Sequence, residues 1–310
     1  MRKILLTGGA GNIGGTLANR IVADEDSYLV IVDNLSTGST DKFPPAAGKN
    51  WKFIKSDVNN YNDLSSIMVS YQFDYVFHYA AVVGVTRTLE NPVSVLNDID
   101  GIRNVLTLSK NTGVKRVFYS SSSEVYGEPV SLPQHEETTP LNSRLPYAIV
   151  KNIGEAFCKS YQLEFGLDYT VFRFFNTYGP GQSDDFVLPR FLKAALKNED
   201  ITIYGDGSQT RTFCYVDDNI DTIMLLLNEN LAVNDTINVG SDQEISILDF
   251  ANLILNITGS KSKLVHLPPL KEGDMTRRQP DISKMKGILK RDLTTLEAGI
   301  LKTMESYRSL

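Results

Sequence analysis

A tyrosine and a lysine stand one helical turn apart in the segment PYAIVK, residues 146–151. Positions i and i+4 share one face of a helix, so Tyr147 and Lys151 are expected to lie side by side. A tyrosine normally titrates at about pH 10 and is a poor base at neutral pH, but a cation one turn away favours the phenolate. Such a pair can take the proton of a hydroxyl group while hydride leaves the same carbon. The spacing alone arises often by chance, so its weight depends on the surrounding motifs.

Four serines and a glutamate follow the apolar run VKRVFY, in the stretch SSSSEVYG of residues 120–127. The run is typical of a buried strand, and Ser122 at its end is placed to share the proton of a substrate hydroxyl with Tyr147. A carboxylate at the end of a central strand costs free energy unless it is exposed or used. Two interpretations of Glu124 remain open: a catalytic acid or base, and a turn residue that binds a backbone amide.

Glycines cluster near the N-terminus, in LLTGGAGNIG of residues 5–14. Gly8, Gly11 and Gly14 follow an apolar strand and open a helical segment, and Gly9, Gly11 and Gly14 also fit the G-x-G-x-x-G form. Glycines there permit a tight turn, let the backbone approach a pyrophosphate and let the helix pack closely. The helix N-terminus then offers amide donors and a positive dipole to the phosphates. The pattern predicts a dinucleotide site.

Two carboxylates favour NAD as the dinucleotide. Asp33 ends the second apolar run, nineteen residues after Gly14, where an acidic side chain binds a ribose 2′-hydroxyl. The same carboxylate would repel the 2′-phosphate of NADP. Asp57 and Val58 end another strand-like run, at a height suited to the adenine. The nicotinamide cation of bound NAD would also favour the phenolate form of Tyr147.

Six apolar runs of strand length alternate with segments of helical period over the first half of the chain. They are KILLT, YLVIVD, WKFIKSDV, DYVFHYAA, VKRVFYSSSS and DYTVFRFFN. Strands buried on both faces and alternating with helices predict an α/β fold, a Rossmann-type doubly wound parallel sheet. Beyond about residue 175, Gly-, Pro- and Asp-rich loops and shorter helical stretches predict a smaller mixed α/β domain. We expect the NAD-binding domain at 1–175, rejoined by about 212–230, and mainly the substrate domain at 176–310.

The composition is that of a soluble globular protein with an acidic balance. The 310 residues carry a formal net charge of −6 and a pI near 5.2, which argues against nucleic acid or an acidic membrane as the main partner. Two cysteines are too few for a disulfide framework, and three separated histidines indicate no metal site. The apolar run after Met1 is too short for a signal peptide, and no run has transmembrane length. A cytoplasmic protein is expected.

Taken together, the motifs resemble those of the extended short-chain dehydrogenase/reductases, within the NAD-dependent nucleotide-sugar epimerase/dehydratase family. The matching pieces are TGGAGNIG, VDNLSTG, SDV, HYAA, SSSEVYG, PYAIVK, FRFFNTYGPGQ, ITIYGDGSQTRTFCYVDD, INVGS and GDMTRRQPDISK. They follow the family order over nearly the whole chain. The resemblance implies NAD as cofactor, a nucleoside-diphosphate sugar as substrate, and a homodimer formed through helices near 93–111 and 147–165.

The resemblance also implies roles for individual residues. Ser122, Tyr147 and Lys151 correspond to the catalytic Ser/Thr, Tyr and Lys, and Glu124 is a further catalytic candidate. The implied cofactor residues are Gly8, Gly11, Asn12, Ile13, Gly14, Asp33, Asn34, Ser36, Thr37, Gly38, Asp57, Val58, Tyr79, Ala80, Ala81, Ser120, Tyr147 and Lys151. The implied substrate residues are Arg87, Ser123, Asn176, Leu188, Tyr204, Arg211 and Arg277. Arginines suit a diphosphate because they are charged, multi-donor forks.

Three places depart from the family pattern. Asn12 stands where an aromatic or hydrophobic residue is commoner, and Asp98 stands where asparagine is usual. The stretch Val82-Val83-Gly84 after HYAA has no charged group, which leaves the sugar side of the nicotinamide less determined.

Every enzyme of this kind begins by oxidising C4 of the sugar with NAD⁺. A 4-epimerase returns hydride to the other face, needs the fewest further residues and is our first expectation. A 4,6-dehydratase, a uronate decarboxylase or a C4 dehydrogenase is the alternative. A glutamate at the position of Glu124 is common in the dehydratases and decarboxylases, and Arg144 precedes Tyr147 as in some decarboxylases, although the flanking LP and AIV differ from their pattern.

A catalytically inactive NAD-binding regulator belongs to a different class. The intact Ser122, Tyr147 and Lys151 argue against it. The loops 180–190 and 200–212 are expected to select the base and the sugar, which the fold itself does not specify.

Overall fold

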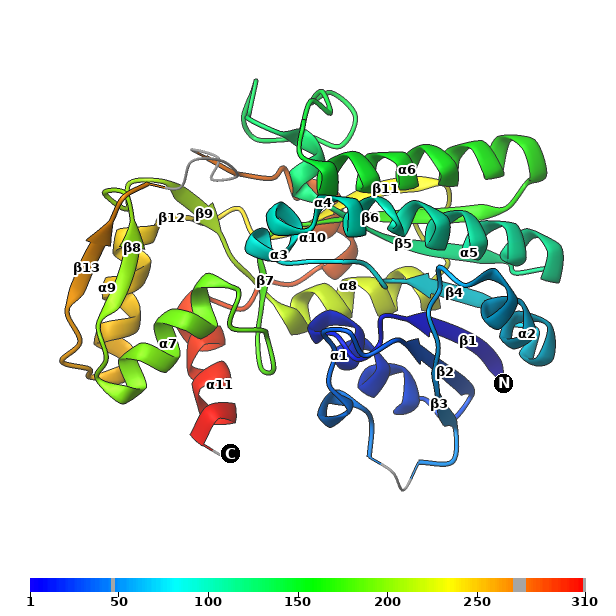
Figure 1. The fold of residues 1–310 in the computed structure, drawn as a ribbon, viewed down its shortest axis with the longest axis horizontal. Helices are drawn as coiled ribbons and strands as arrows, with labels where there is room; N and C mark the ends of the chain where they lie inside the picture. The colour runs from blue at the N-terminus through cyan, green and yellow to red at the C-terminus, as the bar shows by residue number, and fades with distance from the viewer. Residues whose placement is uncertain (46–47, 270–276, 309–310) are drawn as a thin grey trace.

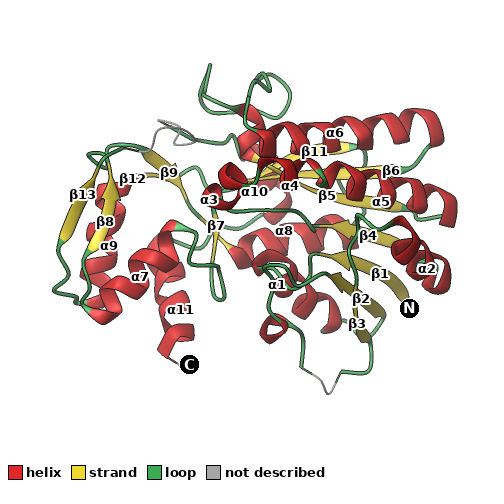
Figure 2. Cartoon of the chain, in the orientation of Figure 1, coloured by secondary structure: helices red, strands yellow, loops and turns green. Residues whose placement is uncertain are grey.

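A seven-stranded, all-parallel sheet forms the centre of the computed structural model, which describes residues 1–45, 48–269 and 277–308 (Figures 1 and 2). Its strand order is β11-β6-β5-β4-β1-β2-β3. The strands are β1 (Arg2–Thr7), β2 (Ser27–Asp33), β3 (Trp51–Lys55), β4 (Tyr75–His78), β5 (Arg116–Ser122), β6 (Asp168–Phe174) and β11 (Asp235–Val239). The direction of winding reverses between β1 and β4. Ligands of open α/β sheets bind at the carboxyl ends of the strands beside such a reversal.

Helices cover both faces of this sheet because alternate strand residues point to opposite sides. Leu6 of β1 packs in one core cluster with Leu17 of α1 (Asn12–Val22) and with α8 (Val216–Asn228) and α10 (Ser283–Leu289). Its neighbour Leu5 packs in a second cluster with Val105 of α5 (Asp98–Thr112) and with α2 (Tyr61–Tyr71) and α6 (Pro146–Phe165). The strands are therefore buried on both faces, as their continuous apolar runs predicted.

Short elements connect the sheet to the site. The 3₁₀ turn η1 (Thr40–Lys42) follows β2, and a second one, η2 (Ser123–Tyr126), continues directly from β5. Two short helices, α3 (Val85–Glu90) and α4 (Pro92–Leu96), lie between β4 and α5.

The remaining elements form a smaller region, most of which lies at the left of Figure 1. They are β7 (Thr177–Tyr178), α7 (Val187–Lys197), β8 (Ile201–Tyr204), β9 (Thr210–Thr212), β10 (Cys214–Tyr215), β12 (Glu244–Ser246), α9 (Ile247–Thr258), β13 (Leu264–Leu267) and α11 (Leu296–Arg308). They pair into three two-stranded sheets, β10-β7, β12-β9 and β13-β8. Phe191, Phe213 and Phe250 of this region belong to the same core cluster as Leu6, so its apolar core is continuous with one face of the central sheet.

The Rossmann-type fold predicted from the sequence is confirmed, and the six predicted strands pair as parallel neighbours. The seventh strand, β11, was not marked as a strand in the sequence. It pairs with β6 and follows α8, so both α8 and β11 belong to the central sheet and its covering helices.

Candidate active site

Ser122, Tyr147 and Lys151 meet at the carboxyl end of β5. Ser122 is the last residue of that strand, and its side chain is hydrogen-bonded to that of Tyr147. Tyr147 lies in the first turn of α6, and Nζ of Lys151 is 5.7 Å from the centre of its ring. Lys151 Nζ also donates a hydrogen bond of 2.7 Å to the carbonyl oxygen of Ser120, the residue two places before Ser122. The strand end and the helix thus hold the three side chains together.

Burial dominates the electrostatics of this group. It raises the pKa of Tyr147 above the ordinary value, while the hydrogen bond from Ser122 acts in the opposite direction. It lowers the pKa of Lys151 to about 8, and the charge of Asp98 opposes that change. The lysine was expected to lower the pKa of Tyr147. The net pKa is nevertheless raised, because the cost of withdrawing a phenolate from water is the largest effect on it.

Glu124 forms a buried ion pair. It lies in η2, where its backbone amide donates to the Ser122 hydroxyl over 3.2 Å. Its Oε1 is 2.6 Å from Nη2 of Arg278, and the two side chains are only 15% and 8% exposed. The second carboxylate oxygen, Oε2, is buried without a hydrogen-bond partner in the described structure. Both groups act on the pKa of Tyr147, which Glu124 raises and Arg278 lowers. Glu124 is therefore not a solvated turn residue.

The arginine that contacts Glu124 is not the one selected from the sequence. Arg277 is exposed, and its Nε and Nη2 atoms lie 2.6 and 2.5 Å from the carboxylate oxygens of Glu244. Its neighbour Arg278 points inward to Glu124. Adjacent residues in an extended segment face opposite ways, so the dipeptide in TRRQPD offered two candidates that spacing alone does not distinguish. Arg278 is the residue that the sequence analysis missed.

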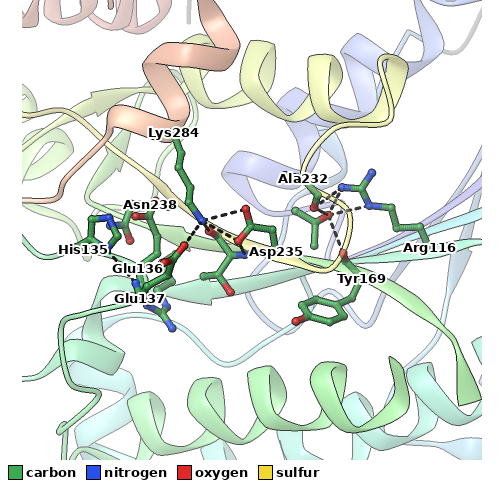
Figure 3. A network of polar contacts seen from close by, with 12 residues as sticks. Arg116, His135, Glu136, Glu137, Tyr169, Ala232, Asp235, Asn238 and Lys284 are labelled. Carbon is green, nitrogen blue, oxygen red and sulfur yellow. Dashed lines mark hydrogen bonds and ion pairs between the residues drawn. The ribbon is translucent and has the colours of Figure 1, made fainter. Parts of the chain in front are cut away.

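A polar network fixes the segment that presents Arg278. The amide of Gln134 donates to the carbonyl of Gln279 over 2.7 Å, and the amide of Asp281 donates to the carbonyl of Gln134 over 2.8 Å. Asn238 of β11 then donates from its amide to Oε1 of Glu136 over 2.8 Å, as the cluster at the left of Figure 3 shows. These hydrogen bonds attach the loop before α6 and the strand-like segment around residue 280 to β11 of the central sheet.

The glycine turn after β1 has the shape of a phosphate cradle. Gly8 has φ +75°, and a Cβ there would lie 2.5 Å from the backbone nitrogen of Ala80. A Cβ on Gly14 would collide with the carbonyl oxygen of Gly8. Gly11 caps α1 without a side-chain hydrogen bond, so the first amides of that helix are open to an anion. These backbone requirements fit the pyrophosphate of a dinucleotide.

The acidic residues expected around the adenosine lie beside that turn. Asp33 at the end of β2 accepts hydrogen bonds from the amide of Ala10 over 3.0 Å and the amide of Leu35 over 2.8 Å. Asp57 accepts from the side chain of Asn34 over 3.1 Å. Each carboxylate retains acceptor capacity for a hydroxyl. These hydrogen-bond acceptors therefore fit NAD, because its riboses carry hydroxyl groups that can donate to them.

The other predicted cofactor residues lie in loops, or in the first turn of α1, at the same edge of the sheet. Those that follow β1, β2, β3 and β4 are Asn12, Ile13, Ser36, Thr37, Gly38, Val58, Tyr79, Ala80 and Ala81. Ala80 and Ala81 line one small space together with Tyr147 and Lys151, while the Tyr79 hydroxyl is buried without a partner in the described structure.

Asn12, one of the departures from the family pattern, makes a specific contact. Its Nδ2 donates to the carbonyl oxygen of Pro180 over 2.6 Å. Pro180 lies in the loop between β7 and α7, so the glycine turn is joined directly to the smaller region.

The residues predicted for substrate binding are more scattered. Arg87 is ion-paired with Asp185 over 3.0 Å, and Asn176 donates to the carbonyl of Thr212 over 2.9 Å. Arg211 is buried and donates to the carbonyl of Thr210 over 2.7 Å. The others that lie within the described residues are Ser123, which is buried, Leu188, whose side chain is 1% exposed in the core, and Tyr204, whose ring is 5.4 Å from the Arg190 guanidinium.

The described residues contain neither a metal-binding cluster nor a membrane-spanning helix. No cluster of three or more His, Cys, Asp or Glu side chains there has an arrangement that would hold a metal ion. Within the same residues, no helix combines the length and the apolar character needed to cross a membrane.

Comparison with known proteins gives consistent relatives. The model of the NAD dependent epimerase/dehydratase family matches residues 4–240. The UDP-N-acetyl-alpha-D-glucosaminuronate decarboxylase of Bacillus cytotoxicus is 35% identical over 100% of this chain and 98% of its own. UDP-glucuronic acid decarboxylase 1 of Xenopus tropicalis is 34% identical over 99% of this chain and 72% of its own.

Solved structures agree on the fold and the cofactor. The UDP-glucose 4-epimerase of Thermotoga maritima with UDP-glucose has a TM-score of 0.92 at 30% identity, over 99% of both chains. The dTDP-glucose 4,6-dehydratase of Streptomyces venezuelae with bound NAD has a TM-score of 0.91 at 25% identity, over 99% of this chain and 97% of the other. The matched residues and the site geometry lead to one conclusion: the chain belongs to the NAD-dependent epimerase/dehydratase family of nucleotide-sugar enzymes.

Proposed function

We propose that the protein decarboxylates a UDP-linked uronic acid after oxidation at C4. The observation that carries this proposal is the buried ion pair of Glu124 and Arg278 beside Tyr147. Burying two charges is expensive, and a 4-epimerase needs no charged group near C5 or C6. A sugar with a C6 carboxylate gives the arginine a ligand, since guanidinium binds carboxylate well. The decarboxylases among the relatives support the same choice and suggest uridine as the base.

The chain's own residues have separate roles in the proposed decarboxylation. Bound NAD supplies the hydride acceptor, and later the hydride donor, at C4. Tyr147 takes the proton of the C4 hydroxyl, with Ser122 hydrogen-bonded to the same group, and Lys151 favours the phenolate. The resulting 4-keto acid loses CO₂ when its C5–C6 bond breaks and the electron pair passes toward the C4 oxygen. Arg278 holds the carboxylate before it leaves, and Glu124, once it has taken a proton from solvent, is our candidate to deliver that proton to C5.

Residues 176–310 supply most of the nucleotide-sugar site in this proposal, and residues 1–175 supply the cofactor site. Arg211 and Asn176 are our candidates to contact the diphosphate and sugar. Arg144, which the sequence offered in favour of a decarboxylase, is exposed and adds no support.

The 4-epimerase expected from the sequence remains the second candidate. Its support is the close fold of the Thermotoga maritima enzyme and a 33% identical putative UDP-glucose 4-epimerase of Methanocaldococcus jannaschii. It also requires the fewest groups beyond Tyr147 and Lys151.

A panel of UDP-, GDP-, CDP- and dTDP-sugars with and without a C6 carboxylate separates the two candidates. We expect CO₂ and a UDP-pentose from a UDP-uronate in deuterated solvent, with deuterium at C5 of the product by NMR. Interconversion of UDP-glucose and UDP-galactose without label at C5, and no CO₂ from any uronate, would instead establish the 4-epimerase.

A further inference from the structure

Asp98 begins α5 beside the space that Tyr147 and Lys151 line. Its Oδ2 accepts a hydrogen bond of 2.7 Å from the amide of Val82, which fixes the carboxylate against the loop after β4. The described residues that line this space are His78, Ala80, Ala81, Asp98, Ile102, Tyr119, Tyr147, Val150 and Lys151. Asp98 is the one carboxylate in that set, and Lys151 is its one amine.

Of the other titratable groups around this space, His78 and Tyr119 are neutral. Asp57 and the Glu124–Arg278 pair are charged, and they lie outside the residues that line it. Burial lowers the pKa of His78 to about 3, so its ring is neutral and shares a 2.8 Å hydrogen bond with the Thr7 hydroxyl. Burial raises the pKa of Tyr119, which is neutral as well. Asp57, after β3, contributes a repulsive charge to Asp98 from the cofactor side. The pair Glu124–Arg278 is compensated within itself and affects Tyr147.

We propose that Asp98 is a positioning residue whose negative charge keeps Lys151 protonated for its work on Tyr147. The proposal rests on the roles assigned above to Tyr147 and Lys151. Burial would otherwise favour the neutral amine, and Asp98 raises the pKa of Lys151 against it. Asparagine, the usual residue of the family here, would make the same hydrogen bond to Val82 but supply no charge.

Asp98→Asn tests the charge without removing the hydrogen bond. The NAD-loaded protein is labelled with ¹³C at lysine Cε, and Lys151→Met identifies the Lys151 signal. The titration midpoint of Lys151 should move to lower pH in Asp98→Asn, because Asp98 raises the pKa of Lys151. Asp100→Asn is the matched control, because Asp100 lies on the same helix in an exposed ion pair with Arg103, and it should leave the midpoint in place.

The pH profile of kcat gives the second readout. Loss of activity above pH 8 should set in at lower pH in Asp98→Asn, because Lys151 loses its proton earlier. Asp98 also raises the pKa of Tyr147, so the acid limb should move to lower pH as well. A Lys151 midpoint unchanged by Asp98→Asn would overturn the proposal. If Asp98→Asn moves the titration midpoint of Lys151 but leaves both limbs of the kcat profile in place, the assigned role of Lys151 is overturned. The proposal then fails with it.

Discussion

At the scale of single residues, Tyr147 is the group on which proton transfer depends. Tyr147→Phe should fold and bind NAD but lower turnover by about two to four decades, the usual range for general acid–base catalysis. Lys151→Met should also lower turnover, because it removes the charge that favours the phenolate. Tyr61→Phe, which alters an exposed tyrosine of α2, is the control. Near-parental turnover of Tyr147→Phe would show that another group is the base.

Glu124 distinguishes the candidate reactions. Glu124→Gln keeps the size of the side chain and removes its charge, so a decarboxylase should lose more than about one decade of turnover and its deuterium incorporation at C5. A 4-epimerase should stay within about one decade, with C5 unlabelled in both proteins. Because glutamine leaves Arg278 without its counter-charge, the free energy of unfolding is measured alongside to separate lost chemistry from lost folding.

At the scale of elements, one buried ion pair ties the catalytic helix to the sheet. Glu155 of α6 and Arg173 of β6 are both 2% exposed, and Arg173 Nε and Nη2 lie 2.9 and 2.7 Å from the two carboxylate oxygens. The hydroxyl of Ser121 donates to Glu155 over 2.6 Å, and Arg173 donates to the Tyr126 hydroxyl over 2.8 Å. Ser121 and Tyr126 flank the turn that carries Glu124, so α6, β6 and η2 are held as one unit.

Glu155→Gln should therefore destabilise the protein strongly. The change leaves the Arg173 guanidinium buried without a counter-charge, for which a loss of about 3 to 5 kcal/mol is usual. Chemical denaturation measures the free energy of unfolding. Glu164→Gln, an exposed position on the same helix, should change it by no more than about 0.5 kcal/mol. Equal stability of the two variants would mean that the ion pair contributes no net stabilisation.

At the scale of the whole molecule, α6 and its neighbours expose an apolar surface that fits the expected homodimer. Val93, Leu96, Ile149, Leu163 and Phe165 are all exposed. Light scattering should give twice the chain mass of 34.5 kDa. Ile149→Arg should shift the mass toward the monomer at low protein concentration. Leu301→Arg is the control, because Leu301 is 44% exposed on α11 where Ile149 is 41% exposed, and it should leave the mass unchanged. A monomer in the parent protein would contradict the prediction.

The sequence by itself determined the Rossmann fold, the NAD turn and the trio of Ser122, Tyr147 and Lys151. These features depend on short-range patterns: apolar runs bounded by glycine, and an i, i+4 pair on one helix. The sequence did not predict β11, because this strand has only five residues, DTINV. It also lies far along the chain from β6, the strand with which it pairs.

Only the tertiary structure decided which group Glu124 contacts. Its partner Arg278 is far away in sequence and stands beside an equally plausible arginine, and the inward direction of one of the two depends on the pairing of residue 134 with residue 280. The sequence did not predict the shifts in pKa either, because they also depend on residues that are far apart in the sequence. Burial is set by packing from several elements at once, and it is the largest of the effects on the pKa of Tyr147.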